Sequence, residues 1–318
     1  MKTALIYCLF SLCCLSACSN QADKKISLAI LTPVTHPSLE QIEKGFKETI
    51  EAKCPGKYNF VTYNAQGNKI LMRSEVEEII RKNYPLILTI GTLPSQMMHE
   101  VTTHKNVTVP VVFTCVNDPI GFHIVPSERT PGGHFTGVKE LLDFEQELSH
   151  LLRFKPGIKQ ILLVYNPMEP GLGKDQQSVA TILKERDISL KTIEIFQNNE
   201  LMAKVSPFME CADAVLTLKD NTVVSGLDAL VKLCNLYHIP LIASDLDSPD
   251  RGAAFGYGVY EIEFGIEAAK KALKILEENI LPGTIPVTPV SQFKFKINAE
   301  AAEKQGIHPS LLTARGAL

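Results

Sequence analysis

The chain has 318 residues, of which 45% are hydrophobic and 21% are charged, and its formal net charge at pH 7 is −3. This is the composition of a globular protein, and the length suits two modest domains or one large one. The slightly negative charge argues against nucleic acid as a partner, because nucleic-acid binding needs a basic surface.

The first eighteen residues have the pattern of a targeting segment. Lys2 precedes an apolar stretch, residues 3–14, which is too short to cross a membrane as a stable helix. The sequence Leu-Ser-Ala-Cys that ends at Cys18 resembles the bacterial lipobox, which implies cleavage before Cys18 and a diacylglycerol on its thiol. The alternative is an ordinary signal peptide with an incidental cysteine. We expect residues 1–17 to be a signal peptide and residues 18–25 a flexible tether.

Strands and helices alternate from residue 26 onward. The predicted strands of this first series are short apolar runs at residues 26–32, 58–64, 86–91 and 109–115. The segments between them carry apolar side chains at helical spacing. Short apolar strands separated by helices of about 10 to 15 residues indicate βαβ units in a parallel sheet.

A second series of the same kind follows the break at Pro131-Gly132-Gly133. Its predicted strands lie at residues 160–165, 190–196, 214–218 and 239–243. Residues 109–119 align without gaps on residues 239–249, and the order of elements around the two segments matches. The repeat predicts an α/β protein with two similar Rossmann-like lobes and a cleft between them, into which the strand ends of both lobes face.

The tail is predicted to complete both lobes and not to form a third domain. We expect the N-terminal lobe to hold residues 26–140 plus about 254–283, and the C-terminal lobe residues 141–253 plus about 284–318. Repeated crossing of the chain between the lobes would form a hinge of several strands, which favours bending of the lobes about the cleft.

Four cysteines remain in the mature chain besides Cys18: Cys54, Cys115, Cys211 and Cys234. An oxidising compartment permits disulfides. Cys115 and Cys234 lie within apolar patterns, however, which favours buried free thiols. No pair of cysteines has the spacing of metal ligands, and no motif predicts a cofactor.

Polar side chains follow two neighbouring strands of the second series. Asn221 and Thr222 come after the strand at residues 214–218, and Ser244 and Asp245 come after the next one. Ligands of open α/β sheets bind beyond the carboxyl ends of the strands, so these four side chains are predicted to face one site. Helix capping is the open alternative, because Asp, Asn and Thr favour helix starts in any case.

Eight short motifs occur in order along the mature chain. They are His36-Pro37, Asn64-Ala65-Gln66-Gly67, Gly91-Thr92, Asn117-Asp118-Pro119, Thr136-Gly137-Val138, Tyr165-Asn166-Pro167, Asp220-Asn221-Thr222-Val223 and Ala243-Ser244-Asp245. In this order they resemble the ABC-transporter substrate-binding lipoproteins of the tryptophan/tyrosine-binding type, which have the type I periplasmic-binding-protein fold. The resemblance implies a lipid-anchored, extracytoplasmic receptor that closes on a small ligand and delivers it to a permease with its ATPase.

For an amino-acid ligand, Asp245 is the candidate partner of the α-ammonium, through a charge-assisted contact. Thr92, Asn221 and Thr222, with backbone N–H groups at helix starts, are candidates for holding the α-carboxylate. The candidates for the side-chain pocket are His36, Gln66, Asp118 and Tyr165. Each also has a structural alternative as a loop, turn, cap or core residue.

The chain departs from the family pattern after Tyr165-Asn166-Pro167. The family usually continues with a Glu, an Asn and a Ser that face the ligand. Here Glu169 remains, but Gly171-Leu172-Gly173 replaces the Asn-Ser pair, which leaves the identity of the ligand open.

Two other functions remain as alternatives. A sensor that presents its closed form to a partner receptor would use the same fold. An extracytoplasmic hydrolase would use His36, Asp118 or Asp245 as acid or base. The sequence contains no Gly-x-Ser-x-Gly, no P-loop and no His-Glu-x-x-His motif, so we predict a binding protein and not an enzyme.

Overall fold

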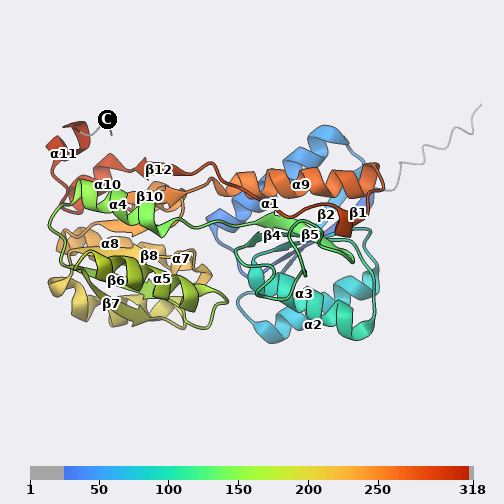
Figure 1. Cartoon of the computed structure of the whole chain (residues 1–318), viewed down its shortest axis with the longest axis horizontal. Coiled ribbons are helices and arrows are strands. Elements are labelled where there is room, and N and C mark those ends of the chain that lie inside the picture. The colour runs from blue at the N-terminus through green and yellow to red at the C-terminus, as the bar shows by residue number, and fades with distance from the viewer. Residues whose placement is uncertain (1–24, 315–318) are drawn as a thin grey trace, which may run out of the picture.

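Two six-stranded sheets organise the chain, one in each of two lobes that lie side by side along the long axis of the molecule (Figure 1). The computed structural model describes residues 25–314. The predicted signal peptide and Cys18 lie outside these residues, as does the tether up to residue 24. The two-lobed α/β architecture with parallel sheets that the sequence predicts is confirmed.

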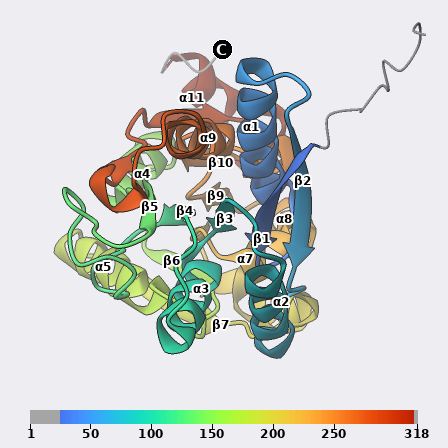
Figure 2. The same ribbon diagram turned by 90° about the vertical axis from the view of Figure 1, so that its right-hand side faces the viewer.

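The first sheet has the strand order β11-β5-β4-β3-β1-β2, and all of its pairs are parallel. Its strands are β1 (Ile26–Thr32), β2 (Tyr58–Asn64), β3 (Ile87–Ile90), β4 (Val111–Val116), β5 (Phe135–Lys139) and β11 (Thr288–Pro289). Helices α1 (Pro37–Lys53) and α9 (Glu261–Glu277) pack together on one face, and α2 (Lys69–Lys82) and α3 (Thr92–Lys105) pack together on the other (Figure 2).

The second sheet repeats this arrangement with the order β12-β10-β9-β8-β6-β7, in which β12 alone runs antiparallel. Its strands are β6 (Gln160–Tyr165), β7 (Ser189–Glu194), β8 (Ala214–Thr217), β9 (Leu241–Ala243), β10 (Phe255–Gly258) and β12 (Lys294–Ile297). The helices of this lobe are α4 (Phe144–Phe154), α5 (Leu172–Glu185), α6 (Leu201–Val205), α7 (Asn221–Ser225), α8 (Leu227–Tyr237), α10 (Ala299–Lys304) and α11 (Pro309–Ala314).

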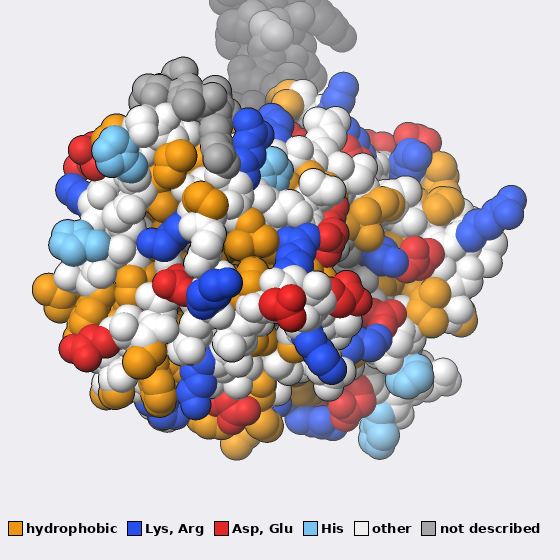
Figure 3. Space-filling model, turned by 60° about the vertical axis from the view of Figure 1, so that its left-hand side comes forward, with side chains coloured by type: hydrophobic (Ala, Val, Ile, Leu, Met, Phe, Trp, Pro, Cys, Tyr) orange, Lys and Arg blue, Asp and Glu red, His pale blue; other side chains and the backbone are white. Residues whose placement is uncertain are grey.

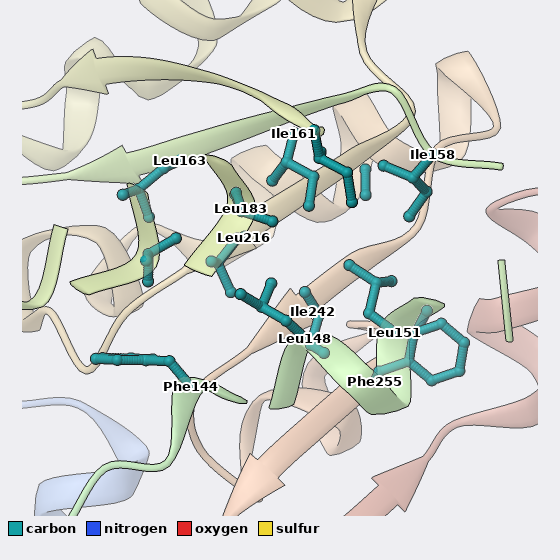
Figure 4. Close-up of a cluster of buried hydrophobic side chains, with 14 of the residues drawn as sticks. Phe144, Leu148, Leu151, Ile158, Ile161, Leu163, Leu183, Leu216, Ile242 and Phe255 are labelled. Atoms are coloured by element: carbon teal, nitrogen blue, oxygen red, sulfur yellow. The ribbon is translucent and has the colours of Figure 1, made fainter. Parts of the chain in front are cut away.

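Strands buried on both faces explain why the sequence shows continuous apolar runs. In the second lobe, Phe144, Leu148 and Leu151 of α4 pack against alternate residues of β6, β8 and β9 (Figure 4). The remaining residues of these strands face a separate cluster with α6 and α8. Burying each such side chain stabilises the lobe by about 1.5 to 3 kcal/mol, so the strand ends are held in fixed positions.

Three segments cross between the lobes: residues 140–143, residues 259–260 and residues 290–293. This multi-strand connection agrees with the predicted hinge, but the predicted boundaries in the tail differ from the sheet membership. Residues 255–258 still pair in the second sheet as β10, and residues 288–289 pair in the first as β11. The absence of a Cβ at Gly256 lets β10 lie close to the loop after β9, since a Cβ there would lie 2.3 Å from the carbonyl oxygen of Asp245.

The surface and the cysteines add little constraint on function. Lys and Arg side chains mix with Asp and Glu side chains on the end face of the second lobe (Figure 3). Within residues 25–314, no helix is both long enough and apolar enough to cross a membrane. Cys54, Cys115, Cys211 and Cys234 are free thiols, and of the two expected to be buried, Cys234 is buried and Cys115 is partly buried.

Candidate functional site

A cavity of about 670 Å³ lies between the lobes, at the carboxyl ends of the strands of both sheets. It opens where the sequence predicted a cleft. Six of the predicted site residues line it: His36, Gln66, Thr92, Asn221, Thr222 and Asp245.

The wall that the first lobe contributes is apolar with hydrogen-bond donors. Its lining residues between Pro33 and Asn117 include no Asp and no Glu, and the one carboxylate that α9 adds, Glu261, is paired with Lys219. Helix α3 begins on this wall at Thr92, and its N-cap, Gly91, has a φ of 91° and offers no side-chain cap. The N–H groups of Thr92 and Leu93 therefore have no intrahelical acceptor and are available to an anion.

The wall that the second lobe contributes is acidic. Four carboxylates line it: Glu169, Asp175, Asp220 and Asp245. Burial raises the pKa of Asp175 to about 7, and the nearby Glu140 carboxylate adds to the effect. Burial disfavours the charged form of this carboxyl, and the Glu140 contribution shows that further negative charge is disfavoured here.

Glu169 occupies the donors that the sequence assigned to the ligand carboxylate. Its Oε2 accepts from the backbone N (3.2 Å) and the Nδ2 (2.9 Å) of Asn221. Its Oε1 accepts from the backbone N (2.8 Å) and the Oγ1 (2.7 Å) of Thr222. These four bonds use the lone pairs of a carboxylate. Asn221 and Thr222 thus hold a side chain of the protein itself. The match to the family pattern, in which this Glu faces the ligand, was the only signal in the sequence for Glu169.

Asp220 lies directly beneath this cluster. It is the N-cap of α7 and accepts from the backbone N of Val223 (3.0 Å) and of Asn166. Burial, followed by the charge of Glu169, raises the pKa of Asp220 well above its ordinary value. The pair Glu169–Asp220 therefore favours a state with one negative charge and not two, because burial and the neighbouring carboxylate both disfavour the ionised form of Asp220.

Asp245 is both a cavity residue and a turn residue. Its Oδ1 accepts from the backbone N of Asp247 (2.8 Å) and of Ser248 (2.6 Å), and its Oδ2 accepts from the Oγ of Ser248 (2.6 Å). These bonds fix the carboxylate in one orientation. They leave a lone pair of Oδ2 for a further donor, because each carboxylate oxygen accepts about two hydrogen bonds.

Lys219 ties the second lobe to the crossing segments. It follows β8, and its Nζ forms ion pairs with Glu140 and, at 2.7 Å, with Glu261. Burial by itself lowers the pKa of Lys219, but the two carboxylates outweigh it and hold the pKa well above its ordinary value. The lysine therefore stays charged and positions two crossings at the floor of the cavity.

His36 and Asn221 connect the two walls directly. The Nε2 of His36, the N-cap residue of α1, lies 3.1 Å from the Oδ1 of Asn221 in the other lobe. A second contact spans the mouth, where the Nζ of Lys174 lies 2.9 Å from the Oδ2 of Asp118.

Three predicted site residues do not line the cavity. Asp118 forms the ion pair at the mouth. Tyr165 is buried in the core of the second lobe. Ser244 turns away from the cavity, and its hydroxyl donates to the carboxylate of Glu147 (2.9 Å). The physical reason is the alternation of strand residues: Tyr165 shares its face with Ile161 and Leu163, which belong to the core.

The departure from the family pattern has a structural counterpart at Gly171. Its φ is 92°, and a Cβ there would lie 2.9 Å from the Nδ2 of Asn117 in the first lobe. A side chain at this position would push the lobes apart at this point. Leu172, which follows, is buried and lines the cavity, so the polar pair is replaced by apolar surface.

The structure also bears on metal binding. Among residues 25–314, no group of three or more His, Cys, Asp or Glu side chains is arranged to hold a metal ion.

Two α/β lobes with parallel sheets, joined by three crossings around a polar cavity, define the type I periplasmic-binding-protein fold. Residues 27–312 match the family model described as ABC transporter substrate binding protein, and the chain belongs to this family.

Individual relatives agree with this assignment. A tyrosine-binding protein of Clostridioides difficile (strain R20291) is 27% identical over 284 residues, which cover 88% of this chain and 81% of that protein. The crystal structure of a conserved domain protein from Vibrio cholerae has a TM-score of 0.84 at 25% identity and covers 91% of this chain and 98% of that chain. An ABC domain from Streptococcus pneumonia in complex with L-Trp has a TM-score of 0.82 at 22% identity, with the same coverage, and shows the shared fold.

Proposed function

We propose that this protein is the extracytoplasmic, lipid-anchored binding component of an ABC importer, and that it carries a zwitterionic amino acid with an aromatic side chain to a permease. The observation that carries the proposal is the separation of charge between the two walls of the cavity. The first-lobe loops between Pro33 and Asn117 contribute donors and no carboxylate, whereas four acidic side chains line the second-lobe wall. A zwitterion complements both walls when its two ends point in opposite directions.

The orientation of the ligand follows from the occupied donors. Because Glu169 already takes the donors of Asn221 and Thr222, the α-carboxylate would lie at the start of α3, against Thr92 and the N–H of Leu93. The α-ammonium would lie at Asp245, whose Oδ2 can accept one more bond. Of the three residues that the sequence proposed for the α-carboxylate, this arrangement keeps Thr92 and leaves Asn221 and Thr222 to Glu169.

The side chain of the ligand would contact the apolar part of the first-lobe wall. Val34, Leu39 and Met72 line the cavity there, and Phe196 lines it from the second lobe. A thioether and a phenyl ring favour contact with an aromatic ring. The tyrosine-binding relative and the L-Trp complex of a structural neighbour support the same class of ligand.

A thermal-shift screen of the mature protein tests the proposal. L-Tyrosine and L-tryptophan should raise the melting temperature, since a ligand at 100 times its Kd adds about 2.7 kcal/mol of stability. Tyramine, which lacks the carboxylate, and 3-(4-hydroxyphenyl)propionate, which lacks the amine, should each give a much smaller shift. Stabilisation by sugars alone would refute the amino-acid assignment, and turnover of any ligand would refute binding without chemistry.

A further inference from the structure

The hydrogen bonds around Asn221 determine the tautomer of His36. Backbone N–H groups can only donate, so the bond from the N of Asn221 identifies Glu169 Oε2 as an acceptor. The Nδ2 of Asn221 donates to the same oxygen at 2.9 Å, so the Oδ1 of Asn221 faces His36. An amide oxygen can only accept. The Nε2 of His36 must therefore carry the proton in this contact.

The other ring nitrogen of His36 is left as an acceptor. The residue is 7% exposed, and burial lowers the pKa of His36 below its ordinary value, so the ring is neutral and Nδ1 has a bare lone pair. Nδ1 has no hydrogen-bond partner among residues 25–314. A buried acceptor without a partner costs about 1 to 3 kcal/mol, which marks the position as one that awaits a donor. Because His36 lines the cavity, a bound ligand can supply that donor.

The groups that face His36 favour a positively charged donor. Asp245 and Glu169 both lie near enough to the ring to influence its charge, and Arg251 acts on it in the opposite direction. Glu169 has its lone pairs occupied, whereas Asp245 Oδ2 retains one. One open acceptor thus comes from each lobe.

We propose that His36 Nδ1 and Asp245 Oδ2 together bind the ammonium group of the ligand, so that one primary amine bridges the two lobes. This inference rests on the proposed function and changes the predicted role of His36, which was the side-chain pocket. Asn221 acts as a positioning residue, because it holds the tautomer that leaves Nδ1 free to accept. The site is complete only when the lobes are closed, since its two acceptors belong to different lobes.

The arrangement makes capture dependent on pH. A protonated His36 would carry a proton on Nδ1 that points at the ammonium, so binding requires the neutral ring. In an open form, where the ring is solvated, its pKa is near the ordinary value of about 6.5. Below that pH the complex holds one proton fewer than the free protein, and the association constant of an amine falls by up to tenfold per pH unit.

Two substitutions distinguish the roles of the two ring nitrogens of His36. In His36→Gln the side-chain amide reaches the place of Nε2 and can still donate to Asn221, but no acceptor remains at the place of Nδ1. In His36→Asn the amide oxygen takes the place of Nδ1, and the bond to Asn221 is lost. Calorimetric titrations from pH 5 to pH 8, with L-tyrosine and with 3-(4-hydroxyphenyl)propionate as probes, would compare both variants with the wild type.

At pH 7.5, His36→Gln should weaken L-tyrosine binding about tenfold or more and leave the desamino probe unchanged, whereas His36→Asn should lose less affinity for L-tyrosine. Asp175 also titrates in this range, with a pKa of about 7. The diagnostic result is therefore a steeper decline of affinity toward acid pH in the wild type than in either variant.

The contrary results distinguish this inference from the proposed function. If His36→Gln binds L-tyrosine like the wild type, weakens both probes equally or keeps the wild-type pH dependence, the role of His36 is wrong while amino-acid binding stands. If the wild type binds neither L-tyrosine nor L-tryptophan, the proposed function and this inference are both wrong.

Discussion

The two walls of the cavity differ in charge although the two lobes share one architecture. Both walls are built from loops at the carboxyl ends of parallel strands. The first-lobe loops between Pro33 and Asn117 present the uncapped start of α3 and no carboxylate, and Glu261 at the start of α9 is paired with Lys219. The second-lobe wall presents four acidic side chains. The repeated fold determines where polar groups meet, and the loops determine the sign of their charge. A ligand with two opposite charges is the solute that such a pair of walls orients.

The largest effect should come from Asp245, because hydrogen bonds hold its carboxylate in one orientation and leave a lone pair of Oδ2 for the ammonium. Asp245→Asn removes the charge at nearly constant size, and we expect it to weaken L-tyrosine binding about 100-fold. Asp250→Asn is the matched control, since Asp250 lies in the same loop, exposed, and pairs with Lys296. Equal affinities for L-tyrosine in the two variants, measured by calorimetry, would show that the ammonium does not bind at this wall.

A smaller loss of affinity for L-tyrosine should follow from Glu169→Gln. This substitution also tests whether the acidic wall holds α7 in place. An amide cannot accept the four bonds that Glu169 now accepts. We expect the free energy of unfolding to fall by about 1 to 3 kcal/mol and the affinity for L-tyrosine to fall about tenfold. Glu185→Gln, on the exposed end of α5, should change neither quantity. If Glu169→Gln instead strengthened binding, Glu169 would compete with the ligand carboxylate for Asn221 and Thr222.

The donor wall can be tested through Thr92. Thr92→Val removes the hydroxyl but keeps the shape, and it should weaken L-tyrosine about fivefold to tenfold. Tyramine, which lacks a carboxylate, should bind both forms equally. Thr103→Val, on an exposed position of the same helix, serves as the control. A loss that is the same for both ligands would mean that Thr92 supports α3 and does not contact the carboxylate.

The smallest expected effect concerns the pH dependence of the unliganded protein. Burial and Glu140 raise the pKa of Asp175 from 3.8 to about 7, so the folded state holds a proton that the unfolded state has lost. This contribution to stability is present at low pH and disappears as the pH rises from about 4 to about 7. Asp175→Asn should flatten that part of the stability curve, as measured by denaturant titration at several pH values. An unchanged curve would show that the carboxylate is already ionised in the folded protein.

Most of the fold could be predicted from the sequence because the strands of both lobes are short apolar runs between turn residues. The convergence of His36, Gln66 and Thr92 with Asn221 followed from the rule that parallel strands end at one edge. The burial of Tyr165 was also within reach, since it continues the alternation of Ile161 and Leu163. Tyr165 is also the first residue of the family motif Tyr165-Asn166-Pro167, which favoured the site over the core.

Other features depended on contacts between distant segments. Glu169 binds α7 across 52 residues of sequence, and no local pattern reveals that the loop after β6 folds back on this helix. The free Nδ1 of His36 likewise depends on Asn221, 185 residues away. The crossing after β10 was misplaced because small residues weaken a strand pattern, although here they allow the backbone of residues 244–245 to approach.

The most direct test of the opposed walls is a crystal structure of the mature protein with L-tyrosine bound. The α-carboxylate should lie within hydrogen-bond distance of Thr92 at the start of α3, and the ammonium should lie at Asp245, with Glu169 still bound to Asn221 and Thr222. A carboxylate that displaces Glu169 from those two residues, or a ligand bound outside this cavity, would contradict the account.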